Sequence, residues 1–152
     1  MFFKELRSTV MVYANTLKNL PSSRELSITQ TSLQNAMMWC GQMLKYNGQG
    51  DNPYANNGNR KTVADIEPMY DKTEAFFVTE NEIELIDTMR ESIQKDIYQL
   101  VDKHVEARKA LILEEQSIQI FAALQAIQQH LVESRMWLGM ELGRRRDEVV
   151  TA

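Results

Sequence analysis

The stretch of residues 79–138 contains neither glycine nor proline, and it restricts most strongly what this chain can fold into. Side chains that are mostly apolar recur in it every three or four residues, at Ile86, Met89, Ile93, Ile97, Leu100, His104, Ala107 and Leu111. This spacing places them along one face of an α-helix. Thr79 is the expected cap, with Glu82 completing a capping box. The sequence permits one helix of about 60 residues, roughly 90 Å long, or a helical hairpin.

A second helical pattern opens the chain. Over residues 2–20 the apolar positions follow an uninterrupted spacing of three and four, at Phe3, Leu6, Val10, Tyr13, Leu17 and Leu20. Pro21 ends this helix, and Ser22 or Ser23 can cap the next one. The next helix is expected to bury one stripe of side chains, Leu26, Leu33, Met37, Cys40 and Leu44. Because the break between the two helices is short, we expect an antiparallel hairpin.

Part of the second helix recurs near the C-terminus. With an offset of 98 residues, five identities in twelve positions align Leu33, Met38, Trp39, Gly41 and Leu44 with Leu131, Met136, Trp137, Gly139 and Leu142. This match predicts an internal duplication, and two unrelated amphipathic helices are the alternative. The alignment also favours the hairpin for the long stretch, with a turn or kink near residues 114–121. Both glycines are expected to allow close approach of neighbouring helices, and both tryptophans fit the core or a subunit interface better than base stacking.

Residues 47–77 have a different character, with three glycines, two prolines and five asparagines. Such a long irregular segment is typical of a functional loop or of disorder, and its aromatic side chains could anchor it over the first hairpin. Its polar side chains suit wrapping of a phosphate, although a solvated turn accounts for them equally well. From composition, the candidate ligand-binding residues of this segment are Tyr54, Asn56, Arg60, Lys61, Asp65 and Tyr70.

These patterns together predict an all-α fold of antiparallel helical hairpins. The expected organisation is a first hairpin over residues 1–46, an irregular loop over 47–78 and a second, degenerate hairpin over 79–152. The long apolar rows imply self-association into a homo-oligomer, but dimers, tetramers and hexamers of hairpins would give the same pattern.

Composition and motifs narrow the classes of function. A net charge of −4 argues against a general duplex-DNA binder, because phosphate neutralisation needs a basic surface. No apolar run reaches the length of a membrane span and no signal peptide is recognisable, so a cytoplasmic location is expected. No catalytic motif or metal-ligand spacing occurs, and Cys40 fits a small buried hydrophobe. We therefore expect no enzyme, no cofactor and no metal.

One face of the second helix carries polar residues that suit ligand binding. Arg24, Ser27 and Thr31 share a polar face near the helix N-terminus, and their repeat partners are alanine and glutamines. The run S-R-E-x-S-x-x-x-T-x-L-x-x-A-x-M-W-x-G, from Ser23 to Gly41, resembles the helical-hairpin domain of phage nucleotide sponges, a family that includes anti-CBASS and Thoeris anti-defence proteins. The resemblance is good over residues 20–75, weak over 115–145 and absent elsewhere.

The resemblance implies a phage protein acting in the infected bacterial host. In that family, oligomers of hairpins sequester cyclic di- or trinucleotides, or cyclic ADP-ribose isomers, without cleaving them. Arg24, Ser27 and Thr31 would bind the ligand here. The alternative is a helical oligomer that inhibits or scaffolds a protein partner. A third possibility is a nucleic-acid adaptor using Arg144, Arg145 and Arg146, although a solvated helix end explains these arginines more simply.

Overall fold

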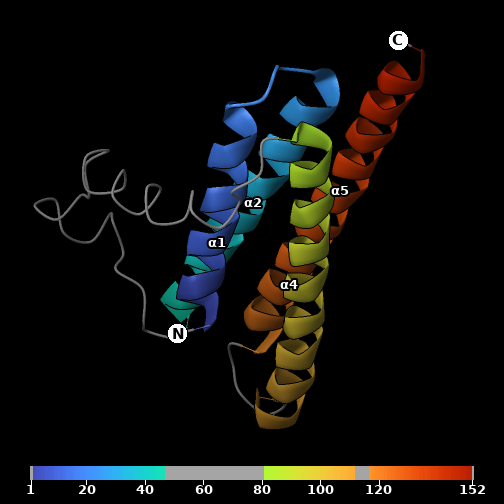
Figure 1. The fold of residues 1–152 in the computed structure, drawn as a ribbon. Coiled ribbons are helices and arrows are strands. Elements are labelled where there is room, and N and C mark those ends of the chain that lie inside the picture. The colour runs from blue at the N-terminus through green and yellow to red at the C-terminus, as the bar shows by residue number, and fades with distance from the viewer. Residues whose placement is uncertain (1, 47–80, 112–116, 152) are drawn as a thin grey trace, which may run out of the picture.

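The structure is a computed structural model that describes residues 2–46, 81–111 and 117–151 (Figure 1). These residues form four α-helices: α1 (Phe2–Lys18), α2 (Arg24–Tyr46), α4 (Glu82–Leu111) and α5 (Ser117–Thr151). None of the described residues is in a β-strand. The all-α prediction is therefore confirmed for the part of the chain that the structure describes.

The first two helices are joined by residues 19–23 and run antiparallel (Figure 1). Pro21 lies in this connection, where its missing N–H and fixed φ prevent α1 from continuing. Ser23 caps α2, because its Oγ accepts a hydrogen bond from the N–H of Leu26 at 3.1 Å. The predicted break and the predicted serine cap are both confirmed, and Ser23 is the capping residue.

The start of α4 differs from the prediction. Its cap is Asn81, whose Oδ1 accepts hydrogen bonds from the N–H groups of Ile83 at 2.9 Å and Glu84 at 3.4 Å. The capping box expected between Thr79 and Glu82 is therefore wrong, since Glu82 is the first helical residue and Thr79 lies outside the described residues. Asparagine is as strong an N-cap as threonine or stronger, so local preference alone did not separate the two positions.

The long stretch without glycine or proline contains two helices. α4 ends at Leu111, α5 begins at Ser117, and the two lie side by side in opposite directions (Figure 1). The single long helix is thus excluded in favour of the hairpin. α5 begins five residues before Ala122, the position that the repeat aligns with the start of α2. α5 therefore begins earlier in the chain than the repeat alignment alone would place it.

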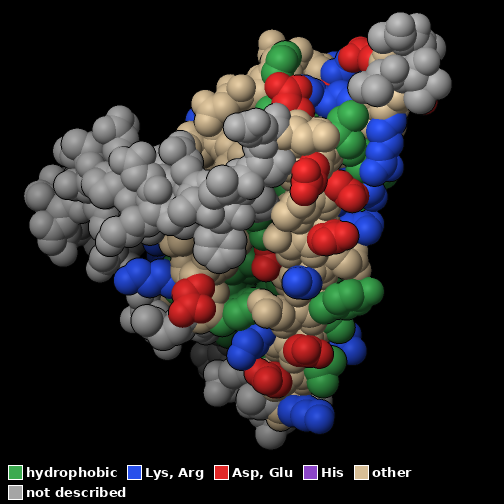
Figure 2. All heavy atoms as spheres, in the orientation of Figure 1, with side chains coloured by type: hydrophobic (Ala, Val, Ile, Leu, Met, Phe, Trp, Pro, Cys, Tyr) green, Lys and Arg blue, Asp and Glu red, His purple; other side chains and the backbone are tan. Residues whose placement is uncertain are grey.

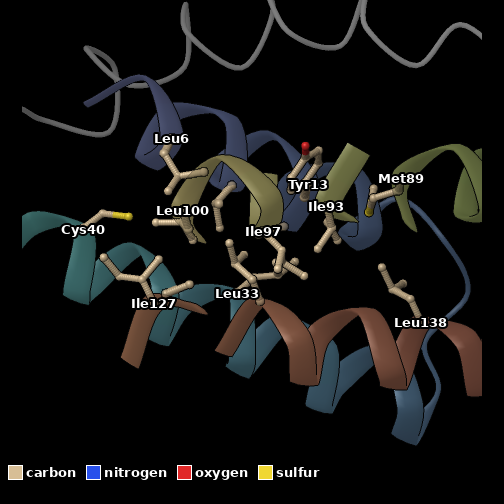
Figure 3. Packing of buried hydrophobic residues seen from close by; sticks show 14 of the residues in the cluster. Leu6, Tyr13, Leu33, Cys40, Met89, Ile93, Ile97, Leu100, Ile127 and Leu138 are labelled. Atoms are coloured by element: carbon tan, nitrogen blue, oxygen red, sulfur yellow. The ribbon is translucent and has the colours of Figure 1, made fainter. Parts of the chain in front are cut away.

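The two hairpins pack through α2 and α5, while α1 packs on α2 and α4 packs on α5. Figure 3 shows buried side chains from all four helices pointing into one shared interior. The buried members of the predicted rows on α1 and α4 are Leu6, Val10, Tyr13, Leu17, Ile86, Met89, Ile93, Ile97 and Leu100. Each helix turns an apolar face to this interior. Within the described ranges, no helix is long and apolar enough to cross a membrane.

The positions matched by the repeat have the same degree of burial. Leu33 and Leu131 are both fully buried, and Met38 and Met136 are exposed to 56% and 52%. The paired leucines, tryptophans and glycines further along agree in the same way. This agreement is what a duplicated hairpin would give, and the duplication itself stays a prediction.

The two aligned glycines have a more specific role than close approach of two helix backbones. A Cβ at Gly139 would come within 3.0 Å of the Arg90 guanidinium on α4, and one at Gly41 would lie 3.7 Å from that of Arg7 on α1. Gly139 thus leaves room for the Arg90 side chain, whereas a Cβ at Gly41 would make only an ordinary van der Waals contact with Arg7. The expectation of helix–helix approach is corrected accordingly, because the nearest atoms belong to flexible side chains.

Gly143 provides a stability prediction on α5, because a Cβ there would meet nothing within 4 Å. Gly143→Ala is expected to raise the free energy of unfolding by about 1 kcal/mol, since glycine is the weaker helix former inside a helix. Denaturant titration followed by circular dichroism measures this change. Gly139→Ala is the matched control and should gain less or lose stability, because Arg90 occupies the space. Equal gains in both variants would contradict the packing described for Arg90.

Candidate functional site

The polar face predicted for α2 is present and open to solvent. Arg24, Ser27 and Thr31 are all exposed on α2, and their spacing puts them on one side of the helix. The Thr31 hydroxyl donates to the backbone oxygen of Ser27 at 3.1 Å, which leaves its oxygen available as an acceptor. Arg24 is the first residue of the helix, next to the Ser23 cap. The structure therefore brings together all three residues that the motif singled out.

Arg24 also contacts the second hairpin. Its Cζ lies 5.9 Å from the centroid of the Trp137 ring on α5, a cation–π geometry. Within the described ranges Arg24 forms no ion pair, so no carboxylate there offsets its charge. Glu25, the residue next to Arg24, lies 4.0 Å from Arg144. Arg24 and Trp137 together form a positively charged, flat surface that spans both hairpins.

Trp137 was not among the predicted site residues. The sequence marked it as a core or interface residue, and it is only half-buried. Trp39, its repeat partner, packs against the core instead. Antiparallel packing of α2 against α5 brings the start of one helix near the late part of the other, and this produces the Arg24 contact. The repeat alignment, together with antiparallel pairing of the two copies, could have placed Trp137 beside Arg24.

A buried carboxylate lies close to this surface. Glu141 on α5 is fully buried and accepts hydrogen bonds from Ser23 Oγ at 2.8 Å, Arg144 Nη2 at 2.5 Å and Arg145 Nε at 2.8 Å. Burial alone would raise the pKa of Glu141, but these hydrogen bonds and the attraction of Arg144 lower it below its usual value. Glu141 is therefore ionised at neutral pH and holds the capping residue of α2 in place.

The arginines on Glu141 extend the contact to one further helix start, that of α4, and to Glu148 on α5 itself. Arg145 also pairs with Glu82 at the N-terminus of α4, and Arg144 pairs with Glu148 at 2.5 Å. We call this set of groups the Glu141 network; it consists of Ser23, Glu25, Glu82, Glu141, Arg144, Arg145 and Glu148. It ties the starts of α2 and α4 to α5.

The interpretation of Arg144, Arg145 and Arg146 as a solvated helix end was wrong. α5 continues to Thr151, and Arg145 is only 8% exposed. The spacing from Glu141 to Arg144 and Arg145 is i, i+3 and i, i+4, which puts these side chains on one side of the helix. That side faces the neighbouring helix starts, so both side chains are paired: Arg145 is buried, while the Arg144 side chain stays 40% exposed. Arg146, the third arginine, is exposed.

A partly buried polar pair lies between α1 and α4. The Tyr13 hydroxyl donates to Asp96 Oδ2 at 2.7 Å. Burial raises the pKa of Asp96 to about 6, although the hydrogen bond from Tyr13 lowers it. Burial and the nearby Asp96 charge likewise raise the pKa of Tyr13. Neither residue was singled out from the sequence, because Tyr13 fitted the apolar row and Asp96 looked like one surface charge among many.

Cys40 is fully buried, and burial raises the pKa of its thiol to about 12. The prediction of a small buried hydrophobe is confirmed. The thiol stays protonated at neutral pH, so it is not a reactive nucleophile. Among the residues that the structure describes, no three His, Cys, Asp or Glu side chains come together to hold a metal ion.

The remaining predicted ligand-binding residues, Tyr54, Asn56, Arg60, Lys61, Asp65 and Tyr70, lie outside the described residues. Comparison of the chain with known protein families, with curated proteins and with solved structures finds no match in any of the three. The sponge family suggested by the motif therefore stays a prediction.

Proposed function

We propose that this chain is a phage anti-defence sponge, which binds a cyclic nucleotide immune signal and sequesters it without cleavage. The ligand classes are cyclic di- or trinucleotides and cyclic ADP-ribose isomers. The observation that carries the proposal is the exposed Arg24 guanidinium, unpaired by any described carboxylate and lying 5.9 Å from the Trp137 ring centroid. Nucleotides combine phosphate with a flat base, and this surface offers a partner for each.

The chemistry of the surface fits capture. The guanidinium provides a planar fork for a phosphate, and the start of α2 adds its helix dipole. Ser27 and Thr31 continue the same face with hydroxyl groups. Sequestration needs affinity alone, so the site requires no nucleophile or general base.

Self-association is part of the proposal. Met38, on the same helix as Arg24, is more than half exposed. A second chain covering it would bury apolar area and close an exposed surface into a pocket. Two chains can also supply more cations to a dianionic ligand than one chain can.

A thermal-shift and calorimetry screen against these three ligand classes tests the function. A ligand at about 100 times its dissociation constant should add roughly 2.7 kcal/mol of stability, and chromatography should recover it intact. Recovery of cleaved ligand would mean an enzyme. If no ligand of the three classes raised the melting temperature, the proposal would be overturned.

Substitution of Arg24 tests the site separately. Arg24→Ala is expected to weaken binding at least tenfold, about 1.4 kcal/mol, because it removes both the phosphate fork and the charge. Arg24→Lys should recover part of the loss through its charge alone. Arg108→Ala is the matched control, because it removes an exposed arginine near the C-terminal end of α4. This variant should bind the ligand as the unaltered chain does. Normal binding by Arg24→Ala would place the ligand elsewhere.

A further inference from the structure

A shallow groove runs along the outer side of the second hairpin, between α4 and α5. One half, about 630 Å³, is lined among others by Arg90, Arg135, Met136 and Met140. The other half, about 730 Å³, includes Val101, Val105 and Arg108 in its lining. Val132 lines both halves, so they form one continuous feature, which we call the α4–α5 groove. Neither Arg24 nor Trp137 belongs to its lining.

The exposed apolar side chains of the molecule concentrate in this groove. Of the eight large hydrophobic residues that are exposed in the described ranges, five line it: Val101, Val105, Val132, Met136 and Met140. The three from α5 are spaced at i, i+4 and i+8, so they form a row along the helix. Single exposed apolar residues are normal, but a contiguous row indicates a binding surface. Methionine is also common in surfaces that accept helices.

Positive charge accompanies the apolar row. Three arginines and one glutamate line the α4–α5 groove, which gives the lining a net charge of +2 in a chain of net charge −4. Figure 2 shows basic and hydrophobic side chains along the edge of the molecule where α4 and α5 lie. The glutamate, Glu133, has His130 Nδ1 3.5 Å from its carboxylate. The groove thus attracts negative charge.

Arg90 in the first half is held in place by a hydrogen bond, and neither Arg90 nor Arg135 forms an ion pair with a described carboxylate. Arg90 Nε donates to the backbone oxygen of Arg135 at 3.3 Å, and its guanidinium lies over Gly139. Arg135 Nε is buried and has no hydrogen-bond partner among the described residues. Burial, Arg135 and Arg146 all lower the pKa of Arg90, against an opposing effect of Asp87. Cations therefore outnumber acids around Arg90.

We propose that the α4–α5 groove binds an acidic amphipathic helix of a partner protein. The groove extends from Arg90 to Arg108 along α4, about 27 Å at 1.5 Å per residue, which is the length of a helix of about 18 residues. Apolar residues of the bound helix at a spacing of three or four would pack on the row from Val132 to Met140. Acidic residues beside them would pair with the arginines.

Charge argues against a second copy of this chain as the occupant. A two-fold contact would place the same positively charged lining against itself, and like charges across an interface are unfavourable. The inference does not depend on the proposed nucleotide site, because the two surfaces share no residue.

Three synthetic peptides of 18 residues test the proposal by fluorescence anisotropy with the full chain. They share one row of leucines at helical spacing and carry glutamate, glutamine or lysine beside it. The glutamate peptide is expected to bind at least tenfold more tightly than the glutamine peptide, and the lysine peptide more weakly still. Equal binding of the glutamate and glutamine peptides, or no binding of the glutamate peptide, would overturn the proposal.

Variants locate the binding on the groove. Arg90→Gln combined with Arg135→Gln should lower affinity for the glutamate peptide at least tenfold. The control, Lys18→Gln combined with Lys45→Gln, removes the same charge from exposed positions on α1 and α2 and should bind normally. Met136→Glu, at a position 52% exposed, should weaken binding similarly without disturbing the fold. If the lysine control weakened peptide binding as much as the arginine variant, the peptide would be attracted by the overall charge of the chain rather than by the α4–α5 groove.

Sedimentation velocity tests the competing occupant. If Met136→Glu dissociated an oligomer of the chain, the α4–α5 groove would be an interface between copies and the proposal would fail. An unchanged oligomeric state together with lost peptide binding is the expected result.

Discussion

Replacement of Glu141 by glutamine is expected to lower the free energy of unfolding by about 3–5 kcal/mol, a large fraction of the stability of a domain this size. Glu141 is fully buried, and Arg145, which is 8% exposed, donates to it at 2.8 Å. The substitution leaves the Arg145 charge inside the bundle with only Glu82 as a partner. Denaturant unfolding followed by circular dichroism measures the change.

Glu148→Gln is the matched control, because it makes the same substitution in the same network at an exposed position. Glu148 pairs with Arg144 at 2.5 Å, but its side chain is 65% exposed, and such surface pairs contribute at most about 1 kcal/mol. Losses of similar size in both variants would mean that burial of Glu141 does not govern its contribution. Because Ser23 Oγ donates to Glu141, the Glu141→Gln variant should also loosen the start of α2 and weaken ligand binding by Arg24.

The second large effect is a gain in stability at mildly acidic pH that comes from Asp96. Its pKa in the folded chain, about 6, lies above the ordinary value of 3.8, so the folded state binds this proton more tightly than the unfolded state. The contribution of Asp96 to stability is therefore greatest below pH 3.8 and is lost as the pH rises through 6. The full difference is about 3 kcal/mol, and close to half of it is present at pH 5.

Asp96→Asn isolates this contribution from the other titrating groups. The variant should be more stable than the unaltered chain at pH 8 by up to about 3 kcal/mol, with the difference shrinking towards pH 4. The asparagine amide oxygen can still accept the hydrogen bond that Tyr13 donates. Chemical unfolding of both proteins at pH 4, 5 and 8 gives the comparison. A stability difference of the same size at all three pH values would contradict the assignment of this pH dependence to Asp96.

Tyr13→Phe provides a second check on the same pair. It removes the hydrogen bond that lowers the pKa of Asp96, so the pH at which stability is lost should move upward. A downward shift would mean that the hydrogen bond from Tyr13 does not lower the pKa of Asp96.

The local features of the fold were accessible from the sequence. The apolar row of α1, the break at Pro21 and the cap by Ser23 depend on neighbouring residues and on the period of an α-helix, and the structure has all three. Features of the fold that no glycine, proline or capping residue marks were harder to predict from the sequence. The turn of the second hairpin contains no glycine or proline, so only the repeat suggested where it lies, and α5 begins earlier than that alignment placed it.

For the site, the sequence by itself determined the exposed face of Arg24, Ser27 and Thr31, because spacing along one helix is fixed by helix geometry. Only the tertiary structure decided that Trp137 lies beside Arg24 and that Glu141 joins Ser23 to Arg145. These contacts join residues up to 118 positions apart, and their geometry depends on how α2 packs against α5. Residue types fix what a side chain can bind, whereas the packing of helices remote in sequence fixes which partner it meets.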